Sequence, residues 1–261
     1  MELELQGKVA FVAAGSRGLG KAIALQLAAE GVRVVICSRK QEAVEQAARE
    51  ISDRTGETVI PLKGDVSKSE DIKEMMDQTV KRFGGLDILL CNGGGPPGGT
   101  FETFDDNAWQ QAFETNLLSV VRLVREALPY IRDGGRILTV ASSSVKEPIP
   151  GLILSNTMRA GVVGLMKSLA RELGPRRILV NTVCPGRIET DRVTELDQAR
   201  AKQQGTSQEA VRKTYVEQIP LGRYGAPEEF AKVVTFLASE ANTYMTGSVF
   251  MVDGGLVKAS L

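Results

Sequence analysis

Short apolar runs alternate with amphipathic stretches along almost the whole chain of 261 residues. A bounded apolar run is typical of a strand buried on both faces, and apolar residues three and four positions apart are typical of a helix. This alternation predicts a doubly wound parallel sheet of about seven strands, flanked by helices and joined by right-handed crossovers. Strands are expected at Val9–Ala14, Val32–Cys37, Thr58–Leu62, Asp87–Cys91, Arg136–Ala141, Ile178–Val183 and Ser248–Val252. Helices are expected after the first strand and near 41–53, 68–83, 106–131, 154–173 and 226–238.

The composition indicates one globular α/β domain over residues 1–261. Hydrophobic residues make up 43% and charged residues 25% of the chain, as in ordinary globular proteins. Lys+Arg and Asp+Glu number 32 each, unlike the basic balance of a nucleic-acid binder. No stretch approaches the roughly 20 apolar residues of a membrane span, and the N-terminus does not read as a signal peptide. We therefore expect a cytoplasmic protein with neither nucleic acid nor membrane as partner.

The cysteines and the lack of histidine exclude several kinds of metal site and catalytic site. Cys37, Cys91 and Cys184 lack metal-ligand spacing and end apolar runs, so we interpret them as small buried hydrophobes and predict no metal site. The chain has no histidine. This excludes a Ser-His-Asp triad, histidine metal ligation and acid–base catalysis by imidazole.

A glycine-rich turn separates the first strand from the first helix. Gly15, Gly18 and Gly20 give the spacing G-x-x-G-x-G rather than G-x-G-x-x-G. A helix N-terminus exposes backbone N–H groups to an anion, and glycine lets the backbone approach a pyrophosphate closely. The turn therefore predicts a dinucleotide site, with a tight connection that binds no ligand as the alternative.

The other strands also end in polar or glycine-rich segments, and in a parallel sheet ligands bind beyond the carboxyl ends of strands. We expect these segments to converge on one crevice; the alternative for each is ordinary turn chemistry. The polar stretch Asp191–Gln218 is too long for a plain connection. We interpret it as a mobile lid over the crevice, or as a fixed surface excursion.

The motifs together resemble the short-chain dehydrogenase/reductase family over nearly the whole chain, and within it the 3-oxoacyl-carrier-protein reductases. Ala13–Gly20 resembles the family's T-G-x-x-x-G-x-G, with alanines in place of its first threonine and glycine. Asp65–Val66 resembles the Asp-Val after the third strand, Cys91–Gly94 the N-N-A-G segment, and Pro185–Thr190 the P-G-x-x-x-T segment. The resemblance implies a Rossmann-like fold. The cofactor-binding residues that it implies are Gly15, Ser16, Arg17, Gly18, Leu19, Gly20, Asp65, Val66, Asn92, Gly93, Gly94, Arg159, Pro185, Gly186, Ile188 and Thr190.

The first turn departs from the family pattern at Ala14. An alanine is tolerated there if the residue needs no positive φ. On that condition we expect the turn to bind the pyrophosphate.

The end of the second strand bears on which nicotinamide cofactor binds. An acidic residue there would bind the ribose 2′-hydroxyl and repel a 2′-phosphate, but Ser38, Arg39 and Lys40 carry no carboxylate. Ser38 can donate a hydrogen bond to a phosphate, and Arg39 can bind the same phosphate through two hydrogen bonds from its guanidinium. Arg17 can also contact this phosphate or stack on the adenine. We predict NADP(H) over NAD(H). The alternative is that Arg39 and Lys40 are only solvated charges.

The resemblance also implies a serine, a tyrosine thirteen residues later and a lysine four further on, with an asparagine upstream. Those positions hold Ser142, Ser155, Arg159 and Asn116, with Ser143 as the next candidate for the first serine. The tyrosine and lysine are thus replaced by serine and arginine. A phenol has a pKa near 10 and can be tuned, whereas an aliphatic hydroxyl is far less acidic and arginine stays charged.

Several functions are compatible with this pattern. The first is an NADP(H)-dependent oxidoreductase that reduces a small or acyl carbonyl compound with an atypical proton donor. The second is a nucleotide-binding sensor or partner subunit with little or no turnover, and the third is a lyase that keeps the cofactor for structure. Tyr215 in the lid is a remote substitute donor, and Lys146 or Glu147 could connect a proton to solvent through water.

Members of the family are commonly homotetramers, so the resemblance implies a homo-oligomer. Ala160, Gly161, Gly164 and Ser168 form a small-residue helix face that would permit close approach of a second helix. The alternative is that this face packs against the chain's own sheet.

Overall fold

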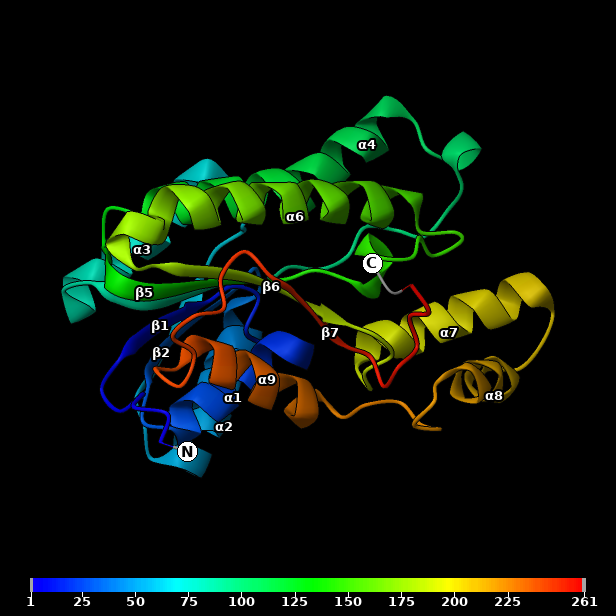
Figure 1. Cartoon of the computed structure of the whole chain (residues 1–261). Coiled ribbons are helices and arrows are strands. Elements are labelled where there is room, and N and C mark those ends of the chain that lie inside the picture. Colours follow the sequence, from blue (N-terminus) through cyan, green and yellow to red (C-terminus); the bar gives the residue numbers. More distant parts are fainter. Residues whose placement is uncertain (1, 260–261) are drawn as a thin grey trace.

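The computed structural model describes residues 2–259 and shows a seven-stranded parallel sheet with the strand order β3-β2-β1-β4-β5-β6-β7 (Figure 1). The chain enters at β1, winds outward to β3, returns to β4 beside β1 and winds outward again to β7. The doubly wound sheet predicted from the sequence is therefore confirmed. The strands are β1 (Val9–Val12), β2 (Arg33–Ser38), β3 (Val59–Lys63), β4 (Leu86–Cys91), β5 (Ile131–Val140), β6 (Leu179–Pro185) and β7 (Val249–Val252).

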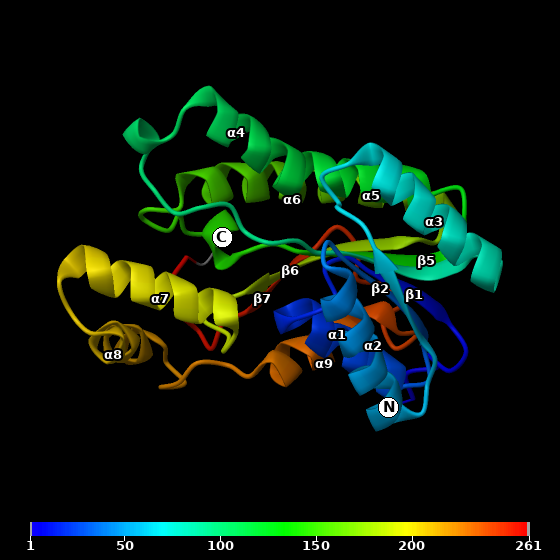
Figure 2. The same cartoon turned by 180° about the vertical axis from the view of Figure 1, so that it is seen from behind.

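Helices cover both faces of the sheet. The views in Figures 1 and 2 place α1, α2 and α9 on one face and α3, α5 and α6 on the other. The α-helices are α1 (Gly18–Ala29), α2 (Gln41–Thr55), α3 (Ser69–Phe83), α4 (Asp106–Phe113), α5 (Ser119–Ala127), α6 (Ile153–Leu173), α7 (Asp191–Gln204), α8 (Gln208–Gln218) and α9 (Pro227–Ala238). Short turns of helix lie at η1 (Phe101–Thr103), η2 (Glu114–Leu118), η3 (Ser143–Val145) and η4 (Gly174–Arg176). Each helix of the described residues is too short or too polar to cross a membrane.

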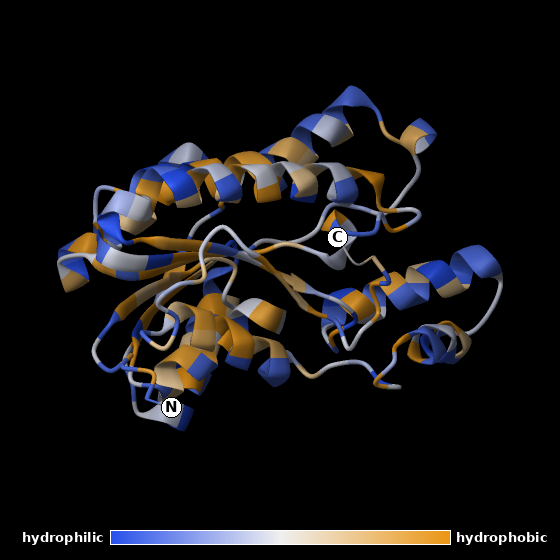
Figure 3. Cartoon of the chain, viewed as in Figure 1, coloured by the Kyte–Doolittle hydropathy of each residue, from blue (hydrophilic) through white to orange (hydrophobic). Residues whose placement is uncertain are grey.

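The core consists of two layers separated by the sheet. Along β1, Ala10 and Val12 pack toward α1, α2 and α9, whereas Val9 and Phe11 pack toward α3, α5 and α6. All four side chains are fully buried, which explains why a central parallel strand is continuously apolar. Figure 3 shows the same distribution, with apolar residues concentrated in the strands.

The single helix expected over 106–131 is interrupted. It consists of α4, the π-helical turn η2 and α5, and it ends at Ala127. The π turn buries Asn116, whose Nδ2 donates to the carbonyl of Ala112. Strand β5 then begins at Ile131, earlier than expected, because Ile131 pairs with Leu86 before the polar, glycine-containing segment up to Arg136.

The stretch Asp191–Gln218 forms two helices, α7 and α8, with a turn at Gly205. Gly205 has a φ of +63°, a conformation that favours glycine. This helical hairpin extends beyond the sheet in Figure 1, and Figure 3 shows it to be mostly hydrophilic. The polar stretch is therefore helical, and the mobility of the hairpin stays a prediction.

The turn after β1 is held by close backbone contacts. A Cβ atom at Gly15 would lie 2.7 Å from Ile36 Cγ2, and one at Gly20 would overlap the carbonyl of Ala14. The Asn92 Nδ2 donates to the carbonyl oxygens of Ala13 and Ala14, at 3.2 and 3.4 Å. The turn backbone is therefore fixed between the helix start and the loop after β4.

Ala14 departs from the condition set above, because its φ is +50°. The close approach of α1 and the two bonds from Asn92 fix this backbone in the left-handed region, which costs an alanine roughly 1–2 kcal/mol. The condition for a tolerated alanine is therefore not met, and binding of a pyrophosphate by this turn stays a prediction. The turn keeps its shape at the cost of local strain.

Replacing Ala14 by glycine should relieve this strain. We expect Ala14→Gly to raise the free energy of unfolding by about 1 kcal/mol, since the relief exceeds the extra chain entropy that glycine gains on unfolding. Urea denaturation measures the change. The matched control Ala13→Gly removes a fully buried methyl where φ is not positive, so it should lower stability by about 1 kcal/mol. Equal destabilisation by both variants would contradict the strain.

Candidate active site

A cleft of about 940 Å³ lies beyond the carboxyl ends of the strands and reaches from the turn after β1 to the α7–α8 hairpin. Its volume suits a dinucleotide with a small substrate beside it. The residues expected at the site that line the cleft are Ser16, Arg17, Gly18, Leu19, Ser38, Arg39, Asp65, Val66, Asn92, Gly93, Gly94, Ser142, Ser155, Arg159, Pro185, Gly186, Ile188 and Thr190. The loops thus meet in one place, as expected for a sheet of this topology.

Three expected site residues lie behind the lining. Gly15 and Gly20 shape the turn through the close contacts described above. Asn116 is 2% exposed and reaches the cleft indirectly, because its Oδ1 accepts a hydrogen bond from Arg159. These residues therefore act on the site through their neighbours.

The outer end of the cleft, beside β2, has no carboxylate at the end of that strand. Ser38 lines the wall with its Oγ 3.4 Å from the backbone N–H of Lys40, and Arg17 and Arg39 are exposed to the cleft. Neither arginine is ion-paired within the described residues. Cys37 lies beneath them, and burial raises the pKa of its thiol to about 12, so it stays a neutral wall residue.

Asp65 follows β3 and is fixed by its own turn. Its Oδ1 accepts from the N–H and the hydroxyl of Ser67, at 2.9 and 2.8 Å. Its N–H donates to Asp71 Oδ2 at 2.8 Å. The turn after β3 thus presents a preorganised carboxylate to the cleft.

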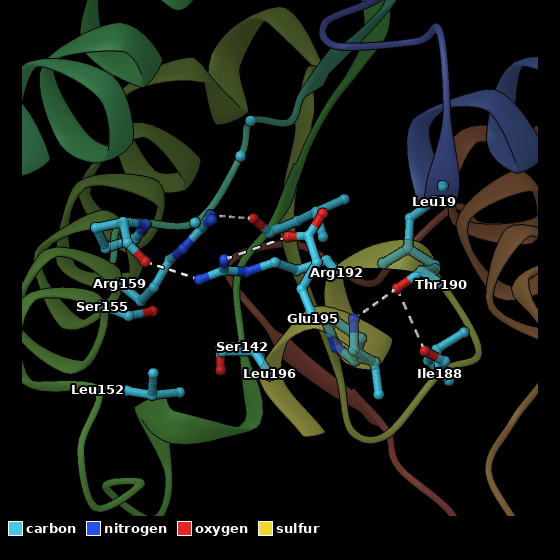
Figure 4. A pocket seen from close by; sticks show the side chains of 18 of the residues that line it. Leu19, Ser142, Leu152, Ser155, Arg159, Ile188, Thr190, Arg192, Glu195 and Leu196 are labelled. Carbon is cyan, nitrogen blue, oxygen red and sulfur yellow. Dashed lines mark hydrogen bonds and ion pairs between the residues drawn. The ribbon is translucent and has the colours of Figure 1, made fainter. Parts of the chain in front are cut away.

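The inner end of the cleft gathers Ser142, Ser155 and Arg159, as Figure 4 shows. Ser142 lies two residues after the end of β5 and caps η3, its Oγ accepting from the N–H of Ser144 at 3.1 Å. Ser155 and Arg159 come from α6, one helical turn apart and therefore on the same face. Strand end and helix bring two hydroxyls and one guanidinium together.

Arg159 carries a buried charge without a carboxylate partner among the described residues. It is 7% exposed; Nη1 donates to the carbonyl of Val140 at 2.5 Å and Nη2 to Asn116 Oδ1 at 3.3 Å, while Nε has no partner in the part of the chain that the structure describes. Burial lowers the pKa of the guanidinium to about 10, so Arg159 remains charged at neutral pH. The site thus holds positive potential suited to a negatively charged oxygen.

Tyr215 alone among the described tyrosines lines the cleft, and it is held in place. The guanidinium of Arg187 lies 3.3 Å from the centroid of its ring, and Arg200 donates to its hydroxyl. Movement toward Ser155 would break both interactions. Of the two loop candidates, Glu147 lines the cleft and Lys146 does not.

The base of the α7–α8 hairpin holds residues that sequence reasoning missed. Arg187 pairs with Asp197 at 2.8 Å, and the other carboxylate oxygen of Asp197 accepts from the hydroxyl of Tyr224 at 2.9 Å. Asp197 is 2% exposed, so this network is buried. The helix that carries Asp197 is mostly polar and has other acidic residues, so its helical spacing alone does not single out Asp197 as the buried one.

Comparison with known proteins supports the architecture. The family model described as enoyl-(acyl carrier protein) reductase matches residues 13–257. The 3-oxoacyl-[acyl-carrier-protein] reductase of Aquifex aeolicus is 36% identical over 98% of this chain and 100% of its own. Dehydrogenase/reductase SDR family member 4 of Sus scrofa is 35% identical over 96% of this chain and 88% of its own.

Solved structures agree with the sequence comparisons. L-sorbose reductase of Gluconobacter frateurii, complexed with NADPH and L-sorbose, superposes with a TM-score of 0.94 at 32% identity and covers 99% of this chain and 100% of its own. Such identities over full-length chains extend beyond likeness of fold. The chain belongs to the short-chain dehydrogenase/reductase family of oxidoreductases.

Proposed function

We propose that this protein is an NADP(H)-dependent reductase that delivers hydride to a small or acyl carbonyl compound, with two serines and an arginine in place of the usual proton donor. The observation that carries the proposal is the single cleft in which the turn after β1 and the group Ser142, Ser155 and Arg159 face one another. The relative L-sorbose reductase was solved with NADPH, which supports the choice of cofactor.

The residues of the outer cleft fit a phosphorylated dinucleotide. The turn up to Gly18 offers backbone N–H groups at a helix N-terminus, and Thr190 lies beside it, 3.8 Å from where a Cβ of Gly18 would stand. Ser38 and Arg39 would hold the 2′-phosphate, and Asp65 the adenine amino group. When bound, the reduced nicotinamide supplies the hydride.

The inner cleft would stabilise charge rather than donate a tuned proton. As hydride reaches the carbonyl carbon, negative charge develops on the carbonyl oxygen. The hydroxyls of Ser142 and Ser155 can donate hydrogen bonds to that oxygen, and Arg159 places a full positive charge close by. The proton of the product alcohol then comes from water. A positioned general acid contributes about 10²–10⁴-fold, so we expect slow turnover.

The proposal also covers the oligomeric state, the movement of the α7–α8 hairpin and the cellular compartment. The small-residue face of α6 (Ala160, Gly161, Gly164 and Ser168) is exposed, so it does not pack on the chain's own sheet and is free to approach a second copy. We propose a homotetramer on this basis and a hairpin, 191–218, that closes over the substrate. Three buried free thiols support a reducing cytoplasm.

Placing the family's tyrosine and lysine at positions 155 and 159 tests whether the site lacks only a proton donor. We expect the double variant Ser155→Tyr with Arg159→Lys to raise kcat about 10²-fold, because a phenol beside a lysine can be tuned toward neutral pH. NADPH oxidation across a panel of carbonyl compounds measures it. The matched control Ser155→Phe with Arg159→Lys supplies the ring without the hydroxyl and should gain nothing.

A second candidate function would emerge from the same experiment. Ser142, Ser155 and Arg159 include no acid with a pKa near neutrality, which favours a nucleotide-binding protein without turnover. If NADPH binds but neither the wild type nor the double variant oxidises it with any carbonyl compound, the reductase assignment is wrong and this second function takes its place.

Cofactor choice should depend on Arg39. Hydrogen bonds to charged groups are worth about 1.5–3 kcal/mol, so Arg39→Ala should weaken NADPH binding about 10- to 100-fold. Binding of NADH, which lacks the 2′-phosphate, should change less than about threefold. Isothermal calorimetry gives both affinities. Lys40→Ala, at an equally exposed neighbouring position outside the cleft, is the control. Equal weakening of both cofactors would contradict the assignment.

A further inference from the structure

The inner face of α7 carries arginines toward the cleft. Arg192, Leu196 and Arg200 follow at four-residue steps and all line the cleft. Figure 4 shows the side chain of Arg192 extending from α7 across the pocket. Its Nη2 donates to the carbonyl of Pro96, in the loop after β4, at 2.8 Å. Arg192 therefore spans the entrance between the hairpin and the body of the protein.

The charge of Arg192 is only partly compensated. The single carboxylate within ion-pair range among the described residues is Glu195, 3.8 Å from Nη1 and one turn away on the same helix. That separation is too long for a hydrogen bond. The bond to Pro96 uses one of the five N–H donors of the guanidinium. The side chain is 41% exposed, so a ligand in the cleft can reach the remaining donors.

The cofactor does not account for this positive charge. Its phosphates would sit at the turn after β1 and at Arg39, at the outer end of the cleft. The inner compartment, in contrast, holds Arg159 and Arg192, and neither makes a hydrogen-bonded ion pair within the described residues. Two cations paired mainly with neutral carbonyl and amide oxygens indicate that an anion completes this compartment.

We propose that the substrate is a carbonyl compound bearing a carboxylate, and that Arg192 binds this carboxylate through its guanidinium fork. The inference rests on the proposed reductase function and names its substrate class. A planar fork matches a carboxylate in a bidentate manner. Glu195 beside the fork disfavours a dianionic phosphate more than a monoanion. Leu152 and Leu196 line the same compartment and suit the hydrocarbon part of an oxo acid.

Matched substrates test the inference. Straight-chain 2-, 3- and 4-oxo acids are compared with their own methyl esters, which have almost the same shape without the charge. We expect wild-type kcat/KM to favour the best acid over its ester at least tenfold. Arg192→Gln should reduce that ratio to about one, and Arg192→Lys, which keeps the charge but loses the fork, should give an intermediate ratio. An ester preferred by the wild type would overturn the inference.

Two variants on the same helix separate a local contact from general electrostatics. Arg200→Gln removes an equal charge two turns further along α7 and should keep the acid preference above tenfold. Glu195→Gln removes the competing carboxylate and should strengthen acid binding about threefold. If Arg200→Gln reduces the preference as much as Arg192→Gln does, the field of the cleft and not Arg192 selects the substrate, and the assignment is wrong.

A binding measurement keeps this inference separate from the reductase assignment. Hexanoate and hexanamide, which cannot be reduced at a ketone, are titrated into the protein with saturating NADP⁺. Arg192-dependent binding of hexanoate without any turnover of carbonyl compounds would support the anion site and contradict the reductase. Turnover with equal binding of hexanoate in wild type and Arg192→Gln would support the reductase and overturn the anion site.

Discussion

The contact between the side chain of Asn92 and the turn after β1 is the interaction on which the site depends. Strand order reverses between β1 and β4, so the connections from these two strands leave in opposite directions and open a crevice. Asn92 crosses that crevice and binds the carbonyls of Ala13 and Ala14. It fixes the turn, with its strained Ala14, at the place where a pyrophosphate would meet the start of α1. The side-chain amide of Asn92 thus connects the loop after β4 to the turn after β1 and fixes the shape of that turn.

Burial of Arg159 lowers the stability of the protein, and the proposed function would give a reason for this cost. A guanidinium that is 7% exposed, with neither a partner for its Nε nor a nearby carboxylate within the described residues, has lost solvation that two neutral acceptors only partly replace. The π turn η2 exists at the position that brings Asn116 to this guanidinium, and π turns are frequently found at functional sites. The arrangement is costly for the unliganded protein; in the proposed function the negative charge that develops beside it would compensate this cost.

The sequence predicted the parts of the structure that follow from local periodicity. Continuous apolar strands such as Val32–Cys37 and the glycine turn have strong local signals, and both lie where they were expected. The break at η2 and the positive φ of Ala14 have none, because each is imposed by a partner distant in sequence: α6 for η2, and Asn92 and α1 for Ala14. Arg192 was missed for a similar reason, since its contact with Pro96 joins segments 96 residues apart.

Two different sets of contacts hold the α7–α8 hairpin to the body of the protein. At its base, Arg187 lies between the ring of Tyr215 and the buried carboxylate of Asp197, which also binds Tyr224. At the entrance, the Arg192–Pro96 hydrogen bond holds α7 to the loop after β4. If the hairpin moves, the Arg192–Pro96 hydrogen bond is therefore the contact that costs least to break. An anion bound to the remaining donors of Arg192 would add a second contact at the entrance, so in the proposed function substrate binding and closure of the hairpin would be coupled through one side chain.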